Sequence, residues 1–301
     1  MANVHTVSGW PFLSALRGVD DVVFLKWNER EGKGRSLFNV RDSTQYQEDN
    51  FTVGGGGIMP QKLEGQPLTY DSLNEGFRST FTHLDYGLAK RITRNLLRDE
   101  LHPILERIGT ETARQARATE ETLLANHYNR AFNASYTGPD GQVLCATAHV
   151  REDGSTYANR PTSDADLSQT SLEQGFIDFS DFRDGGGKRI SIEPAHLVVA
   201  KENRFEAHRL LMSSQSPEND TNAVNPLDGL VQACVWNYLT DADAWFLQAE
   251  KEDHGLVLYV REEFWTDYEF DWDSKDYKFS GMFAQSSGWI DPRGFYGTEG
   301  A

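Results

Sequence analysis

The sequence predicts an α+β protein in which one very long helix and one long β-hairpin accompany a mixed α/β middle. Three patterns predict this fold class. Apolar and small residues recur with helical spacing from 99 to 132, aromatic and acidic residues alternate from 264 to 273, and short helix and strand patterns follow one another between them. With 301 residues, 38% of them hydrophobic, the chain is long enough to bury a sizeable core.

The first third of the chain is the least core-like. Residues 19–28, "VDDVVFLKWN", are expected to form a short strand after a loosely structured arm. The polar segment 32–70 then contains the glycine run Gly54, Gly55, Gly56 and Gly57. Structureless loops longer than about 12–15 residues are usually functional or disordered, so this segment is expected to be an extended hairpin or lobe that stands off the body.

Two strand patterns lead into the long helix. Residues 76–86 and 87–97 carry β-branched and aromatic residues at intervals and are expected to be strands. For the helix from about 99 to 132, Asp99 is the expected N-cap and Pro103 falls in the first turn, where proline is tolerated. At about 1.5 Å per residue this helix would be roughly 48 Å long, with Gly109 as its weakest point.

The middle of the chain predicts a layered α/β unit. Strands are expected at 143–150, as a pair within 189–200, at 229–239 and at 244–250, and helices at 163–182 and 203–214. Thr170 and Glu173 have the spacing of a capping box in the first of these helices.

A long β-hairpin is predicted near the C-terminus. Phe264, Tyr268 and Phe270 share one face of a strand, while acidic residues occupy most of the other face. A turn at 273–276 leads to a returning strand that ends near Phe283. The hairpin is therefore expected to be half buried over 263–283.

The composition excludes several classes of protein. The net charge of −17 would repel a polyanion, so sequence-specific DNA or RNA binding is not expected. Cys145 and Cys234 lie outside any CxxC pattern, which fits a reducing cytosol and predicts neither a disulfide framework nor a zinc site. No apolar run of 18 residues occurs, so neither membrane insertion nor export is supported.

No pattern predicts catalysis or a cofactor. Neither glycine run, 54–57 nor 185–187, is followed by the lysine and hydroxyl residue of a phosphate-binding loop. Acids at alternate positions of a strand lie about 7 Å apart, too far to share one Ca²⁺. HExxH and GxSxG patterns are absent, and His127 and His196 are expected to be packing or surface residues. A catalytic triad assembled from distant residues stays open.

Charge is distributed unevenly along the chain. Residues 86–117 carry seven Lys and Arg against four Asp and Glu, and residues 241–276 carry twelve acids against three bases. These blocks could form surface salt bridges within one subunit or set the register between copies. Long protrusions that one chain cannot cover would need burial on neighbours, which favours a repeating subunit of a ring or shell.

The order of these segments resembles the major capsid proteins of tailed bacteriophages, of the Hong Kong 97-type fold, and is most similar to the Mu-like major head subunits. The likeness rests on "EGQPLTYDSLNEGF", "THLDYGLAKRITRNLLRDEL", "RATEETLLANHYNRAFN", "RISIEPAHLVVAKENRFEAHRLLMSS" and "GWIDPRGFYGTEGA". It covers most of the chain from about Glu64 onward.

The resemblance implies a domain plan and a function. Residues 1–40 would be the N-arm, 41–75 the extended loop, 76–132 and 253–285 the peripheral domain, and 133–252 and 286–301 the axial domain. The chain would self-assemble into hexamers and pentamers of an icosahedral virion shell around double-stranded DNA, formed in the cytoplasm of a bacterial host. Portal, scaffolding and decoration proteins would be its partners; no cofactor, metal or membrane is implied.

Inter-subunit contacts are expected at two places. On the extended loop they are Gly54, Gly55, Gly56, Gly57, Lys62 and Glu64, and at the tip of the C-terminal hairpin they are Asp271, Asp273, Ser274, Lys275 and Asp276. The glycines are expected to give conformational freedom to a loop that a neighbour holds. Two alternatives remain: an intracellular acidic enzyme with a dispersed active site, and a scaffold or decoration protein of a virion.

Overall fold

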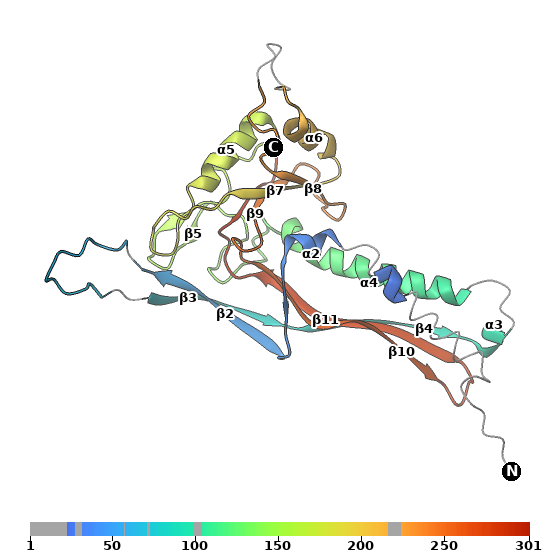
Figure 1. Cartoon of the computed structure of the whole chain (residues 1–301). Helices are drawn as coiled ribbons and strands as arrows, with labels where there is room; N and C mark the ends of the chain where they lie inside the picture. Colours follow the sequence, from blue (N-terminus) through green and yellow to red (C-terminus); the bar gives the residue numbers. More distant parts are fainter. Residues whose placement is uncertain (1–22, 28–31, 57, 71–72, 99–103, 216–223) are drawn as a thin grey trace.

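The computed structural model describes residues 23–27, 32–56, 58–70, 73–98, 104–215 and 224–301. A broad lower layer holds the long strands and the long helix, and a wedge of shorter elements rises from it (Figure 1). The helices are α2 (Lys33–Leu37), α3 (Arg94–Arg98), α4 (Ile104–Asn129), α5 (Gln169–Ser180) and α6 (Arg204–Met212). The strands are β1 (Asn39–Asp42), β2 (Gln47–Gly55), β3 (Leu73–Thr82), β4 (Leu84–Ile92), β5 (His149–Val150), β6 (Thr156–Tyr157), β7 (Pro194–Val199), β8 (Gln232–Val235), β9 (Trp245–Ala249), β10 (Leu256–Phe270), β11 (Tyr277–Trp289) and β12 (Phe295–Thr298).

Two four-stranded sheets organise the described residues. In the lower layer the order is β1-β10-β11-β4, with β1 parallel to β10 and the other pairs antiparallel. In the wedge the order is β12-β9-β7-β8, with β7 parallel to β8. The antiparallel pair β2-β3 forms a separate hairpin that projects from the lower layer (Figure 1).

Apolar packing joins the layers. Phe264, Phe279 and Phe283 pack against the small residues of α4, and a second cluster lies between α5, α6 and the sheet of the wedge. A third cluster joins the two parts around Tyr128 of α4, which also donates a hydrogen bond of 2.5 Å to Gln248 Oε1. Because the end of α4 belongs to this shared core, the helix fixes the wedge to the lower layer.

The longest predicted elements are present with shifted ends. Helix α4 is described from Ile104 to Asn129 and so ends three residues before the expected position, because 130–132 form turns. The proposed cap Asp99 and Pro103 lie outside the described residues. The β10–β11 hairpin has the expected alternation around Phe264, which is buried while Trp265 is exposed, but Phe270 of the same predicted face is exposed near the tip. The hairpin also begins at Leu256 and ends at Trp289, well beyond 263–283.

Several shorter predictions are wrong. Residues 23–27 are helical rather than a strand, and Arg94–Arg98 form α3 where a strand was expected to continue. Of the strand expected at 143–150 only two residues are β5, and 189–200 contributes the single named strand β7. Helix α5 is capped by Ser168 with Ser171 rather than by Thr170 with Glu173, because the helix begins two residues earlier than that box requires.

Candidate functional site

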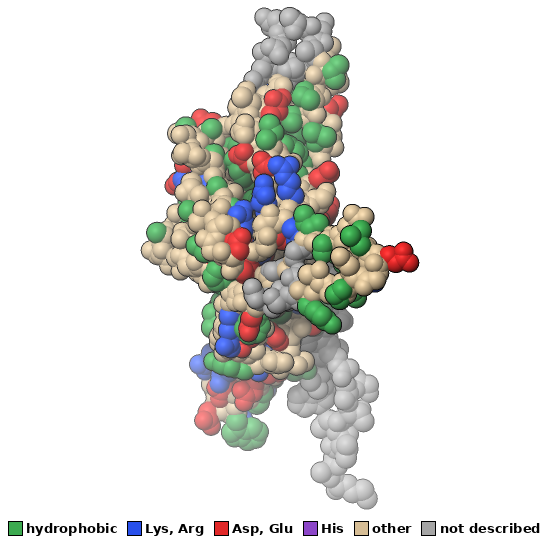
Figure 2. All heavy atoms as spheres, turned by 90° about the vertical axis from the view of Figure 1, so that its left-hand side faces the viewer, with side chains coloured by type: hydrophobic (Ala, Val, Ile, Leu, Met, Phe, Trp, Pro, Cys, Tyr) green, Lys and Arg blue, Asp and Glu red, His purple; other side chains and the backbone are tan. Residues whose placement is uncertain are grey.

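The β2–β3 hairpin carries apolar side chains that its own subunit leaves uncovered. Met59 is 94% exposed near the outer end of the hairpin. Figure 2, viewed from the side toward which the hairpin projects, shows hydrophobic side chains around that end and Lys and Arg side chains on the body beside it. The exposed apolar residues on this segment are Phe51, Val53, Ile58, Met59, Leu63, Leu68 and Tyr70. Exposed apolar groups of this kind are typical of surfaces that contact another molecule, so this segment is a candidate contact surface.

Polar contacts across the strands stiffen the stem of the hairpin. Asp49 accepts hydrogen bonds from Arg78 at 2.5 Å and from Thr80 at 2.6 Å. These bonds, the one from Arg78 first, lower the pKa of Asp49 to about 2. The Arg78 guanidinium also lies 5.7 Å from the centre of the Phe51 ring. The stem is therefore an ordered platform for the apolar residues beyond it.

The predicted contact residues of this segment do not share one conformation. Gly54 and Gly55 belong to β2 and pair with Asn74 and Leu73, whereas Gly56 has a φ of 85°, which favours glycine. Gly57 lies outside the described residues. The two charged residues, Lys62 and Glu64, are exposed beyond the strands.

The tip of the β10–β11 hairpin is built largely by its own side chains. Asp271 accepts hydrogen bonds from the backbone N–H groups of Asp273 and Ser274, and Lys278 Nζ lies 3.2 Å from its carboxylate. The bond from Lys278 and the backbone bonds lower the pKa of Asp271 to about 2. Asp271 therefore shapes the turn inside the subunit.

Of the other tip residues, some contact side chains of their own subunit and one is exposed to solvent. Lys275 adopts a φ of 59°, and its Nζ lies 3.6 Å from the ring centre of Trp272, which is 77% exposed. Asp276 pairs with Arg91 of β4 at 2.8 Å, so this contact between the basic and acidic blocks is made within one chain. Asp273 is exposed and is the acid best placed to meet a neighbour.

The two predicted contact regions lie at opposite ends of the lower layer. The β2–β3 hairpin projects from one side, and the tip between β10 and β11 lies at the other (Figure 1). The structure therefore does not gather these residues into one site, as a catalytic centre would require. The two groups of predicted contact residues therefore lie far apart within one subunit.

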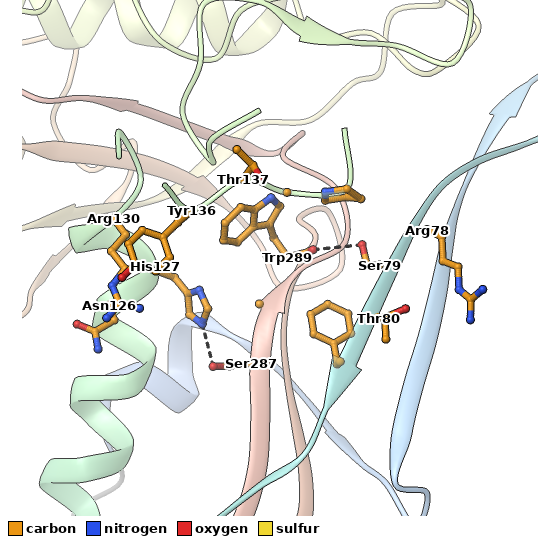
Figure 3. A pocket seen from close by; sticks show the side chains of 14 residues that line it. Arg78, Ser79, Thr80, Asn126, His127, Arg130, Tyr136, Thr137, Ser287 and Trp289 are labelled. Carbon is orange, nitrogen blue, oxygen red and sulfur yellow. Dashed lines mark hydrogen bonds between the residues drawn. The ribbon is translucent and has the colours of Figure 1, made fainter. Parts of the chain in front are cut away.

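A cleft of about 430 Å³ lies between the root of the hairpin, the end of α4 and the turn at 136–139. His127 from α4 faces Ser287 of β11, with Nε2 and Oγ 2.8 Å apart (Figure 3). Burial, with a smaller effect from Arg130, lowers the pKa of His127 to about 4, so its ring is neutral at pH 7. In the described part of the chain no carboxylate orients this ring, so the pair lacks the third member of a catalytic triad.

Within the described ranges, no three His, Cys, Asp or Glu side chains come together in a way that could hold a metal ion. No helix in the same ranges combines the length and apolarity needed to cross a bilayer.

Sequence reasoning missed the apolar character of the exposed surfaces. The sequence did contain a signal for this exposed apolar surface: Ile58 and Met59 directly follow the glycine run in an otherwise polar segment. On the wedge, Phe205 is exposed at the start of α6, in a segment for which the sequence predicted a helix but no exposed apolar residue. These residues enlarge the candidate contact surface beyond the charged and glycine positions.

Comparison with known proteins gives consistent matches. A family model described as phage capsid protein matches residues 78–297. The capsid structure of the cyanophage P-SCSP1u matches with a TM-score of 0.59 at 10% identity, over 89% of this chain and 87% of that chain. The bacteriophage JBD30 capsid matches with a TM-score of 0.58 at 14% identity, over 70% and 92%. A chain of Microbacterium phage Oxtober96 matches with a TM-score of 0.55 at 9% identity, over 89% and 91%.

The search of curated proteins found no match. At identities this low, the structural likenesses speak for the fold alone. They confirm the α+β, Hong Kong 97-type fold that the resemblance implied.

Proposed function

This chain belongs to the phage capsid protein family and is a major capsid shell protein, and from that premise we propose how its copies assemble. They form hexamers and pentamers of an icosahedral shell that encloses double-stranded DNA. In each capsomer the β2–β3 hairpin lies over a neighbouring subunit. The observation that carries this proposal is the row of exposed apolar side chains on that hairpin, which the subunit itself leaves uncovered.

The domain plan follows the same proposal. Residues 1–40 act as the N-arm and 41–75 as the extended loop; the peripheral domain comprises 76–132 and 253–285, and the axial domain comprises 133–252 and 286–301. The Mu-like head subunits are the proposed branch of the family. Exposed Phe205 and Met212 on α6 support a contact between axial domains at the capsomer centre.

Partners beyond the chain itself are proposed by chemistry and by analogy. The net charge of −17 suits a container that holds DNA without sequence-specific contacts. One matching JBD30 capsid is decorated with minor capsid protein trimers, which supports a decoration partner here. Scaffolding and portal proteins are proposed as further partners from the family resemblance alone. Assembly takes place in the bacterial host cytoplasm. The family is one of structural proteins, and we propose no catalytic role.

The test is assembly itself. Purified protein at high concentration is expected to form rings or shells in negative-stain electron microscopy. The double variant Met59→Ser, Tyr70→Ser should lose these assemblies because it removes exposed apolar surface, while its unfolding transition stays unchanged. The matched control is Gln61→Ser, on the same exposed segment, which should assemble normally. Strictly monomeric wild-type particles, or normal shells from the double variant, would overturn the proposal.

A further inference from the structure

The outer end of strand β2, next to the segment that connects it to β3, touches the wedge at a point where only glycine fits. Gly54 lies against the side chain of Glu152, which follows β5. A Cβ added at Gly54 would lie 2.5 Å from Glu152 Cβ and 2.7 Å from its Cγ, far closer than real carbon contacts. The absence of a side chain at Gly54 therefore lets Glu152 lie directly on the strand.

The second glycine run of the sequence meets the first at this point. A Cβ on Gly185 would lie 2.2 Å from Glu152 Oε2 and 2.9 Å from the Cα of Gly54. Gly76 of β3 closes the third side, since a Cβ there would lie 2.9 Å from Glu152 Cγ. Three glycines from three distant segments thus form a seat for one carboxylate side chain. We call this arrangement of Gly54, Gly76 and Gly185 the glycine seat.

The hairpin is irregular at the same level. The register between β2 and β3 shifts between Phe51 and Val53, where buried Thr52 accepts a hydrogen bond of 2.8 Å from the backbone N–H of Phe77. Such a bulge bends the strand that contains it. The hairpin therefore changes direction beside the glycine seat. The contact between Glu152 and the glycine seat sets the direction of the segment that connects β2 to β3.

An ion pair holds Glu152 in the glycine seat. Its carboxylate lies 3.4 Å from Arg293, and the two side chains are only 6% and 12% exposed. Arg293 is itself fixed, because its Nε donates to both carboxylate oxygens of Asp291 at 2.8 and 2.7 Å. A largely buried carboxylate is costly to leave without its partner, so Glu152 is held in one position.

We propose that Glu152 acts as a clasp that holds the β2–β3 hairpin at one angle to the body of its own subunit. The clasp aims the exposed apolar end before a neighbour arrives. A segment ordered in advance loses less conformational freedom on binding, which favours association. The clasp is a property of the single chain; its value for assembly rests on the proposed shell function.

The test measures the direction of the hairpin within one chain. Spin labels are attached to Gln61→Cys on the hairpin and Lys201→Cys on the wedge, both exposed positions, in a Cys234→Ala background. The labelled chain is diluted with unlabelled chain, so that only intramolecular distances contribute whatever the assembly state. Pulsed electron paramagnetic resonance is expected to give one narrow distance distribution.

Glu152→Ala and Gly54→Ala should each widen that distribution at least twofold, because one removes the clasp and the other fills the glycine seat. The double variant Glu152→Ala, Gly54→Ala should widen the distance distribution no more than Glu152→Ala alone, because both substitutions disrupt the same contact. Gly186→Ala is the control, because Gly186 is an exposed residue of the same glycine run, next to buried Gly185.

Glu152→Ala adds no atoms and decides the question even if Gly54→Ala misfolds. A distribution as narrow as wild type in Glu152→Ala, or effects that simply add in the double variant, would overturn the clasp. Loss of shells with an unchanged distribution would count against the clasp and leave the shell function standing. Absence of shells from the wild type would count against the shell function alone.

Discussion

Replacing Arg35 with methionine is expected to destabilise the subunit by about 2–3 kcal/mol. Arg35 Nε donates to Glu120 at 2.8 Å, and its two terminal nitrogens donate to the carboxylate of Glu263 at 2.9 Å each. The Glu120 side chain is only 1% exposed. Removing one partner of a buried pair costs about 3–5 kcal/mol, and the remaining bond from Arg117 to Glu120 reduces that cost.

Urea unfolding of the dissociated subunit, followed by tryptophan fluorescence, measures this difference. The matched control is Arg78→Met, whose pair with Asp49 is exposed and should contribute little. The contact joins α2, α4 and β10, so the variant should lower the unfolding midpoint without changing the slope of the transition. An Arg35→Met subunit no less stable than Arg78→Met would refute the view that this network anchors the segment that leads into the hairpin.

Two further predictions concern pH and the hairpin tip. Burial lowers the pKa of His127 from about 6.5 to about 4. Between these pH values the unfolded chain binds a proton at His127 and the folded chain does not. The free energy of unfolding should therefore fall by roughly 3 kcal/mol as the pH drops from above 6.5 to 4. Thermal unfolding at both pH values should show a smaller fall in His127→Gln, and an equal fall would exclude His127 as the cause. At the tip, Asp273→Lys should impair shells and leave thermal unfolding unchanged, whereas Asp271→Lys should also destabilise the subunit because Asp271 shapes the turn. Normal shells from Asp273→Lys would remove that residue from the interface.

Segments with a periodic sequence predict their structure well, because many residues indicate the same secondary structure and the same buried face. In β10 the side chains of Phe264 and Tyr268 are more buried than those of Trp265 and Asp267, as the alternation from 264 onward indicates. The sequence pattern does not predict that the hairpin extends back to Leu256, because both faces of that stretch are buried and apolar and polar residues no longer alternate.

Short apolar runs and long-range contacts were beyond sequence reasoning. Residues 23–27 combine β-branched and aromatic residues that suit a strand, yet Val23 and Trp27 are buried on one side of a helical turn. For the first glycine run the sequence predicts a loop that a neighbour holds, and it predicts no contact between that run and residues 185–187. Only the folded chain shows that Gly54 and Gly185 meet at Glu152, because nothing in their local sequences encodes that distance.

Cryo-electron microscopy of the assembled protein tests the central claim most directly. The account predicts a closed shell in which each β2–β3 hairpin lies on a neighbouring subunit, with Met59 and Tyr70 buried in that contact and Glu152 still seated against Gly54 of its own chain. Compact monomers, or a shell whose hairpins fold back onto their own subunits and leave Met59 exposed, would contradict it.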